Sequence, residues 1–417
     1  MNKRNFIRFG IIFLVPLSFI ISQCIHETKP AVSFNDPRGN AYAGSATCIT
    51  CHKKVSEDYI HTAHFQTSRL ATQASVLGSF APGSNVVKYN DSISVIMEKH
   101  NDGLLYQASY VNGKLREAQP FNIVFGFKRA ETFLYWKDSY VYQLPVTYYT
   151  QLHEWANSPG YSDKRPYYTR MIGEACFECH SSNIKQIPPT QEQIIKKTIG
   201  LSSNTMMLSI DCERCHGPAA QHVNFHLENP KEKQPMYITK ISGLSRAQRS
   251  DLCGVCHSGI NQVAWSTFDF KPGDTLTKYF DGRFLNQAPD VTQIDVHGNQ
   301  IGLLKGSKCY IQGKIECGTC HGMHDNGVKT VKMYSQICQS CHSNASHNNV
   351  CKMTDQIGLP IAGNCLDCHM PIKSSHSIVI HGTAKQNDFY QARMHRIAIY
   401  PEETEKVMAM FKGEKVD

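Results

Sequence analysis

The amino-acid sequence predicts an α+β fold made mainly of short helices and loops, with one β-rich insert. Three observations predict it. One short cysteine motif recurs seven times at uneven intervals along the 417-residue chain. The cysteine-free stretch between Cys51 and Cys176 alternates short apolar runs with turn residues. Apolar residues make up only 41% of the chain, so we expect something besides side chains to fill part of the interior.

The repeated motif is Cys-x-x-Cys-His, and its seven copies use fourteen of the 17 cysteines. Two thiols at this spacing add to the two vinyl groups on one porphyrin edge, and the adjacent histidine then faces the iron, so this is the c-type haem attachment motif. Zinc knuckles, the alternative, do not require that histidine. We therefore expect the helices and loops to pack around seven covalently attached c-type haems. The attachment residues are Cys48, Cys51, Cys176, Cys179, Cys212, Cys215, Cys253, Cys256, Cys317, Cys320, Cys338, Cys341, Cys365 and Cys368, and the proximal ligands are His52, His180, His216, His257, His321, His342 and His369.

The N-terminus has the layout of a secretory signal. Three basic residues precede an apolar run over residues 11–21, which is short for a stable membrane span. Cys24 follows directly and predicts a lipoprotein with a lipidated cysteine; ordinary cleavage and an uncleaved anchor are the alternatives. We expect the protein in the periplasm or at the cell surface, anchored to the membrane.

The motifs suggest eight segments. These are a signal peptide (1–23), a tether (24–43), a first haem segment (44–75), a β-rich insert (76–172), haems two to four (173–260), a link (261–305), haems five to seven (306–375) and a C-terminal tail with a helix (376–417).

Within these segments, hairpin turns at 101–103 and 112–113 separate predicted strands over residues 92–99, 104–111 and 114–118. Further strands are predicted at 121–127, 132–137 and 141–149. The clearest helices are predicted at 55–71 and 401–412, the latter with proline at its start and Gly413 after it.

The sixth iron ligand decides what each haem can do. A second strong ligand makes an electron-transfer haem, whereas an open position admits substrate. With 20 histidines and seven in motifs, the surplus favours mostly bis-histidine ligation. The candidate distal ligands are His64, His222, His297, His324, His347 and His376, followed by His381 and His395. His222 lies only six residues after His216, and the porphyrin of the His216 haem separates it from the opposite face, where a distal ligand must bind. We therefore expect it to ligate a neighbouring haem.

Two cysteines outside the motifs, Cys309 and Cys351, predict a disulfide in an oxidising compartment; two unpaired buried thiols are the alternative. The formal charge is +8. Without residues 1–23 and with fourteen haem propionates, the net charge becomes about −9 reduced and about −2 oxidised. This balance, with no basic run, argues against a nucleic-acid partner.

Several stretches resemble the multihaem cytochromes c related to cytochrome c-554 and, more remotely, the hydroxylamine oxidoreductase group. They are "GSATCITCHKKVSEDYIHTAHFQTS", "QLPVTYYTQLHEWANSPGY", "CERCHGPAAQHV", "SKCYIQGKIECGTCHGMHD" and "CLDCHMP". The resemblance implies that His64, His222 and His324 ligate haems other than their sequence neighbours, and the Cys309–Cys351 pair fits its pattern. The chain lacks the Cys-x-x-Cys-Lys motif of ammonia-forming nitrite reductases, and a five-coordinate haem does occur in the tetrahaem relative.

We expect an exported heptahaem cytochrome that carries electrons in respiration, more an electron-transfer protein than a catalyst. Its partners would be redox proteins, such as a membrane quinol oxidase module or a terminal reductase. One alternative is a multihaem oxidoreductase that acts on a small nitrogen or sulfur compound at one open-coordination haem. Another is a tethered subunit of a larger respiratory complex, docking through the β-rich insert or the tail.

Overall fold

The computed structural model of the chain describes residues 32–259, 263–281, 290–325, 327, 329–342, 351, 353–381 and 387–413. The predicted signal peptide, Cys24 and His347 lie outside these residues. The α-helices are α2 (Ser45–Cys51), α3 (Lys53–Tyr59), α4 (Glu174–His180), α5 (Gln191–Lys196), α6 (Cys212–His216), α7 (Ala220–Glu228), α8 (Arg246–His257), α10 (Gln300–Lys305), α11 (Lys308–Gln312), α12 (Cys317–Cys320), α13 (Val331–His342), α14 (Thr354–Ile357), α15 (Cys365–His369) and α16 (Pro401–Lys412). Short 3₁₀ turns are η1 (Phe65–Thr67), η2 (Ile241–Gly243), η3 (Thr267–Asp269), η4 (Leu276–Lys278) and η6 (Leu359–Gly363).

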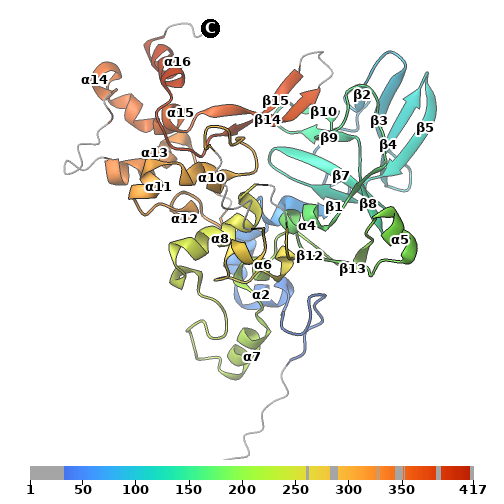
Figure 1. Cartoon of the computed structure of the whole chain (residues 1–417), viewed down its shortest axis with the longest axis horizontal. Helices are drawn as coiled ribbons and strands as arrows, with labels where there is room; N and C mark the ends of the chain where they lie inside the picture. The colour runs from blue at the N-terminus through green and yellow to red at the C-terminus, as the bar shows by residue number, and fades with distance from the viewer. Residues whose placement is uncertain are drawn as a thin grey trace, which may run out of the picture.

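The strands are β1 (Ser68–Leu70), β2 (Val86–Lys88), β3 (Ile93–Lys99), β4 (Leu105–Val111), β5 (Lys114–Pro120), β6 (Ile123–Phe125), β7 (Ala130–Lys137), β8 (Tyr140–Gln143), β9 (Val146–Tyr149), β10 (Glu154–Asn157), β11 (Arg170–Ile172), β12 (Ser181–Gln186), β13 (Leu201–Leu208), β14 (Ile372–His381) and β15 (Asn387–Arg393). Helix and strand are thus mixed, as in an α+β fold. Figure 1 places most strands on one side and most helices on the other and below.

Two antiparallel sheets form the β side. One has the order β2-β3-β4-β5; the other runs β1-β6-β7-β8-β11, with β9 joining β7 to β10. Strands form over every run predicted between residues 92 and 149. The last of these runs divides into β8 and β9 around Pro145, which has no N–H to donate to a ladder.

The main apolar core fills the space between these sheets. Fourteen buried side chains cluster there, among them Met97, Phe121, Phe133 and Trp155. A second cluster joins Phe125 of β6 to Phe177 of α4, and so attaches the sheet to the helix that carries the second motif. The described helical side has much smaller clusters, of five and three buried residues. Its helices therefore have little aliphatic core of their own.

The predicted helix over 55–71 is wrong. Helix α3 ends at Tyr59, and residues 68–70 form β1, which pairs with β6. The buried Thr62 explains the break, because its hydroxyl donates to the carbonyl of Tyr59 (2.7 Å) and accepts from the N–H of Phe65 (3.2 Å). Such local side-chain bonds compete with the helical ladder. The C-terminal helix, in contrast, is confirmed as α16, with proline at N1 and Gly413 in the left-handed conformation.

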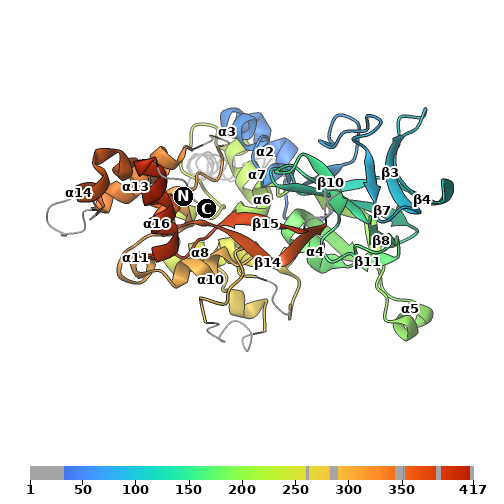
Figure 2. The ribbon, with the colours of Figure 1, turned by 90° about the horizontal axis from the view of Figure 1, so that it is seen from above.

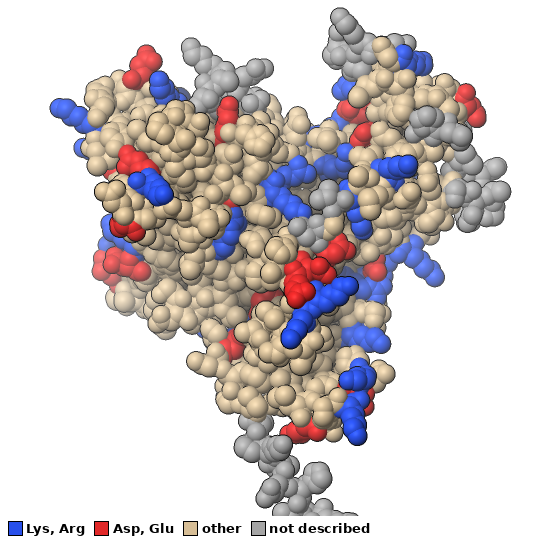
Figure 3. All heavy atoms as spheres, turned by 180° about the vertical axis from the view of Figure 1, so that it is seen from behind, with Lys and Arg blue, Asp and Glu red and all other residues tan. Residues whose placement is uncertain are grey.

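Two hairpins were not predicted: β12–β13, which follows the second motif, and β14–β15, which follows the seventh. The β14–β15 hairpin reaches across to the β side, where Ile380 is buried with Tyr149 and Ala156. Figure 2 shows it lying between the two halves. Seen from behind, the surface is hollowed between two upper parts, and basic and acidic side chains are interspersed over it (Figure 3). Among the described residues, no helix is both long and apolar enough to cross a membrane.

Candidate haem centres

All seven motifs lie on helices or at their C-terminal ends. They occupy α2, α4, α6, α8, α12, α13 and α15. On a helix, residues three and four apart share a face, so both cysteines and the following histidine of each motif project to the same side. Each motif therefore presents the three groups that c-type attachment requires.

Cysteines from different motifs contact one another. Thiols of different motifs lie close enough to shift each other's pKa: Cys212 raises the pKa of Cys48, Cys256 that of Cys179, Cys317 that of Cys253, and Cys365 that of Cys338. Weaker electrostatic contacts join Cys215 to Cys253 and Cys256, and Cys320 to Cys338. Motif one is thus next to motif three, and motif three is next to motif four. Motif four is next to both motif two and motif five. Motif six follows motif five, and motif seven follows motif six. The attachment positions thus form one continuous path, with motif two branching off at motif four.

Four motif histidines each face a second histidine. Ring centroids are 6.5 Å apart for His52 and His222, and 5.9 Å for His216 and His324. The separation is 6.2 Å for His64 and His257, and also 6.2 Å for His321 and His395. His222 thus lies beside the histidine of motif one rather than beside His216 of its own motif.

These separations match the space that an axial pair leaves for one metal ion. A metal–imidazole bond is about 2 Å long, so two coaxial nitrogens lie about 4 Å apart and their ring centroids roughly 6 Å. Rings in direct contact would lie closer. Among the described residues, no group of three or more histidines, cysteines and carboxylates could hold a metal alone. Two imidazoles without further protein ligands suit a macrocycle that supplies the other four donors, so the residues fit haem.

Several of these rings are oriented through Nδ1. The Nδ1 atom of His222 lies 2.7 Å from the carbonyl of Met236, that of His369 lies 2.9 Å from the carbonyl of Ala398, and that of His395 lies 3.0 Å from the carbonyl of Arg393. A carbonyl only accepts, so Nδ1 carries the proton and Nε2 keeps its lone pair. A metal-bound imidazole usually donates its other ring N–H to such an acceptor, which fixes the orientation of the ring. In the same way, Nδ1 of His180 lies 3.0 Å from the hydroxyl of Thr67, and Nδ1 of His257 lies 3.3 Å from Oε1 of Gln300.

Burial keeps many of these rings neutral. It lowers the pKa of His64 to about 4, with the nearby His257 acting in the same direction. Burial also lowers the pKa of His180, His216, His222, His257, His297, His321 and His395. A neutral imidazole is the form that ligates metal, so the fold favours the ligand state at neutral pH.

The remaining candidates have different surroundings. The ring of His180 stacks on Phe125, with centroids 4.7 Å apart and planes 8° apart, and His297 is near enough to lower its pKa electrostatically. The ring of His297 contacts Tyr390. His376 is exposed on β14, where its backbone N–H donates to Asp295 (2.5 Å). Within the described residues, no second histidine ring contacts His376.

His395 ranks below His64, His222 and His324 among the sequence-based candidates, although the fold brings it to His321. Its sequence signal was weak, because it stands far from every motif and follows a hairpin that was not predicted. Cys309 and Cys351 are both free thiols in the structure, and Cys351 lies near Cys368. The disulfide between them stays a prediction.

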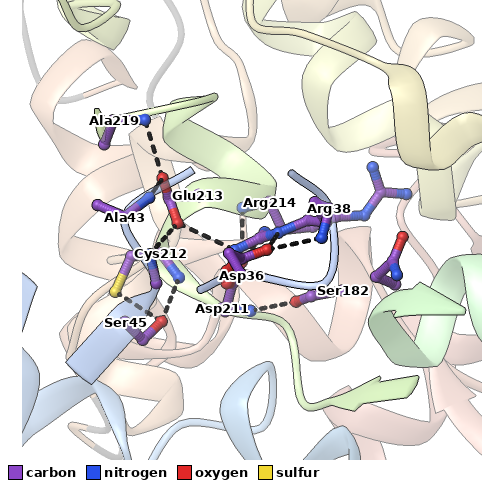
Figure 4. Close-up of polar contacts among 12 residues, drawn as sticks. Asp36, Arg38, Ala43, Ser45, Ser182, Asp211, Cys212, Glu213, Arg214 and Ala219 are labelled. Atoms are coloured by element: carbon purple, nitrogen blue, oxygen red, sulfur yellow. Dashed lines mark hydrogen bonds and ion pairs between the residues drawn. The ribbon is translucent and has the colours of Figure 1, made fainter. Parts of the chain in front are cut away.

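A buried ionic cluster supports motif three (Figure 4). Arg38 donates to Asp36 (2.9 Å), to Asp211 (3.1 Å) and to Glu213 (2.9 Å), and all four side chains are at most 8% exposed. Asp211 also caps α6 by accepting from the N–H of Arg214 (2.8 Å). The cluster therefore ties the N-terminal segment to the helix of motif three.

Glu213 links the elements that carry the first histidine pair. Its carboxylate accepts from the backbone N–H groups of Ala43 (2.9 Å) and Gly44 (2.8 Å), just before α2, and of Ala219 (2.8 Å), just before α7. Helix α2 precedes His52, and α7 carries His222. Burial raises the pKa of Glu213, while these donors and Arg38 oppose that shift. One carboxylate thus positions both members of the His52–His222 pair.

Comparison with known proteins gives one distant relative. The multiheme cytochrome MtrA of Shewanella baltica (strain OS185) is 23% identical over 212 residues, which cover 49% of this chain and 47% of that protein. The chain spans about half the length of this relative. No family model matches the chain, and no solved structure matches it. The relative supports a multihaem cytochrome; the narrower likeness to cytochrome c-554 has no support from these comparisons.

Proposed function

We propose that this chain is an exported heptahaem c-type cytochrome that transfers electrons in respiration. The likeness to a multiheme cytochrome indicates electron transfer as the general activity, covalent haem as the cofactor and a location outside the cytoplasm. The observation that carries the finer proposal is the set of four histidine pairs whose ring centroids lie 5.9–6.5 Å apart. In each pair a motif histidine faces a histidine from another part of the chain.

Each bound haem would supply one reversibly exchanged electron. The residues of this chain do the rest. The cysteines and motif histidines would hold each haem from one side, and His222, His324, His64 and His395 would close the first, third, fourth and fifth centres. His297 is the candidate for the second centre, and His347 is a sequence-based candidate for one of the two remaining centres. The contacts between motif cysteines order the attachment positions along a path, which suits transfer over a distance.

The location and partners belong to the same proposal. A cleaved signal with a lipid on Cys24 would hold the mature protein on a membrane facing the periplasm or the outside. Electrons would then pass between a membrane quinol oxidase module and a terminal reductase or other redox protein. No nucleic-acid partner is proposed.

The test is to count the haems and assess their ligation. Protein matured in a host that attaches c-type haem should contain seven haems by mass and by pyridine haemochrome assay. Its oxidised EPR spectrum should be dominated by low-spin signals. In the His395→Ala variant, one centre should become high-spin and the reduced protein should gain one carbon monoxide site. A haem content below seven would contradict the cofactor count, and an unchanged His395→Ala spectrum would contradict the fifth pair.

The matched control is His376→Ala. His376 is exposed and contacts no second histidine ring among the described residues, so this variant should keep the wild-type spectrum. A high-spin signal in His376→Ala would instead restore the sequence-based assignment of His376 as a distal ligand.

The second candidate function is a multihaem oxidoreductase for a small nitrogen or sulfur compound. Motif two favours it, because its His180 stacks on Phe125 of the β side rather than facing a second imidazole ring. Carbon monoxide binding separates the two functions. If the reduced wild-type protein binds no carbon monoxide, electron transfer is the function that remains. If it binds one equivalent, and only a substitution near Phe125 abolishes this binding, the open site lies at motif two.

A further inference from the structure

The segment between β12 and β13 carries a cluster of exposed isoleucines. We call residues 187–199 the isoleucine tip; it includes α5. Its four isoleucines are exposed to 73% (Ile195), 55% (Ile194), 47% (Ile199) and 36% (Ile187). Figures 1 and 2 show α5 projecting from the β side at the end of its hairpin. Single exposed aliphatic side chains are ordinary on proteins, but four together on one projection form a patch.

The tip contacts the rest of the protein through polar groups, and Gln193 and Thr198 are its partly buried side chains. The amide of Gln193 donates to the hydroxyl of Tyr140 (2.7 Å), which also lies 3.4 Å from the hydroxyl of Thr198. At the base of the tip, the N–H of Leu201 donates to the carbonyl of Ser139 (2.7 Å). The tip is therefore held on the β7–β8 turn by polar bonds, and its isoleucines point away.

The isoleucines are not required for the helix to form. A complete capping box at Thr190 and Gln193 begins α5, and Lys197 ends it in the left-handed conformation. Lys196 adds an ion pair with Glu192 (2.5 Å) on its surface. Polar residues would serve as well as isoleucine at positions 194 and 195 for local stability. Their apolar side chains therefore indicate contact with something outside the chain.

We infer that the isoleucine tip inserts into the surface of an anionic lipid bilayer. Three lysines and one glutamate lie on or beside it, namely Lys185, Lys196, Lys197 and Glu192, which leaves an excess of positive charge. Interfacial binding grows with buried apolar area and with attraction to anionic headgroups, and a small isoleucine cluster rimmed by lysines provides both. A protein partner would need about 800 Å² from each side, which a projection of thirteen residues does not offer by itself.

Membrane contact through the tip would also orient the protein. Strand β12 begins at Ser181, directly after the motif histidine His180, and leads to the tip. Docking would thus turn the second motif, and the strands that pack against it, toward the bilayer. This orientation rests on the proposed function, whereas lipid binding by the tip does not.

Vesicle binding tests the inference. The mature chain from residue 25 would be exported behind an ordinary signal peptide, so that neither the apolar leader nor a lipid on Cys24 contributes. Binding would be measured by co-sedimentation, with the protein quantified on gels, using phosphatidylglycerol–phosphatidylethanolamine vesicles and pure phosphatidylcholine vesicles. We expect binding to the anionic vesicles and at least a tenfold weaker partition for the Ile194→Ser, Ile195→Ser double variant.

The matched control replaces two exposed leucines elsewhere on the β side, Leu104→Ser with Leu115→Ser, which are 50% and 60% exposed. This control should bind like the wild type. The visible spectrum should be the same in all three proteins and their melting temperatures should be similar, because each substituted side chain is at least half exposed.

Three results would overturn the inference. The wild type could fail to bind anionic vesicles, or the isoleucine double variant could bind as tightly as the wild type. In sedimentation velocity without lipid, the wild type could also self-associate in a manner that the double variant loses, which would assign the tip to contact between copies of this chain. Loss of haem spectra with intact vesicle binding would count against the proposed function alone.

Discussion

Replacing Arg38 by methionine should destabilise the protein through the buried carboxylates that it neutralises. Methionine keeps part of the aliphatic stem but removes the charge, every donor and the guanidinium group, whose Cζ lies 4.3 Å from the ring centroid of Tyr42. Asp36, Asp211 and Glu213 would then be three buried carboxylates without their shared cation. The charged form of Arg38 is favoured in the folded state, because its hydrogen bonds and ionic contacts raise its pKa despite burial.

The magnitude follows from the burial of this cluster. The Arg38 side chain is 6% exposed, and the three carboxylates are 4%, 8% and 1% exposed. Removing one partner of a buried ion pair typically costs about 3–5 kcal/mol, since the other charge stays desolvated. We expect a decrease in melting temperature of roughly 5 °C or more, followed by far-ultraviolet circular dichroism. Arg116→Met on the exposed strand β5 is the control and should change the stability by less than about 0.5 kcal/mol.

The penalty should depend on pH with a definite sign. In the wild type, Arg38 lowers the pKa of Asp36, so this group contributes stability above its ordinary pKa that is lost as the pH falls. In Arg38→Met, the unpaired carboxylates should have raised pKa values and lose stability as the pH rises. The difference between the two proteins should therefore be largest near pH 7.5 and shrink toward pH 4. A decrease no larger than that of Arg116→Met, or a penalty independent of pH, would refute this reasoning.

Two other sites give stability predictions. Burial raises the pKa of Glu131 to about 6 although Arg69 pairs with it, so its contribution to stability is fully present below its ordinary pKa and is lost as the pH rises through 6. Thermal unfolding of Glu131→Gln between pH 4 and 7.5 should lack this part of the pH dependence, and an unchanged profile would exclude Glu131 as its source. Gly78→Ala should cost about 1–3 kcal/mol because a Cβ there overlaps the ring of Trp155. Gly243→Ala, where a Cβ has open space, is its control, and equal melting temperatures for the two variants would contradict the steric argument.

Alternating apolar residues, turn residues and helix caps are local signals, and they predicted several strands and one helix correctly. The alternating runs of 92–118 form β3, β4 and β5, and the capped segment 401–412 forms α16. The helix expected over 55–71 does not form in full, because the Thr62 side chain interrupts it and residues 68–70 pair with β6 instead. The pairing of β1 with β6 joins residues more than fifty positions apart, so no local pattern could reveal it.

The same division applies to the candidate haem centres. The cysteines and histidine of each motif lie within five consecutive residues, so the sequence alone is enough to predict the attachment positions and motif ligands. It also determined the surplus of histidine that makes bis-histidine ligation feasible. The packing of distant segments brings His222 to His52, His324 to His216 and His395 to His321, and no local pattern identifies these partners. The reason is physical: an axial pair needs two rings on opposite sides of one iron, and residues on opposite sides must come from separate segments that only the packed fold brings together.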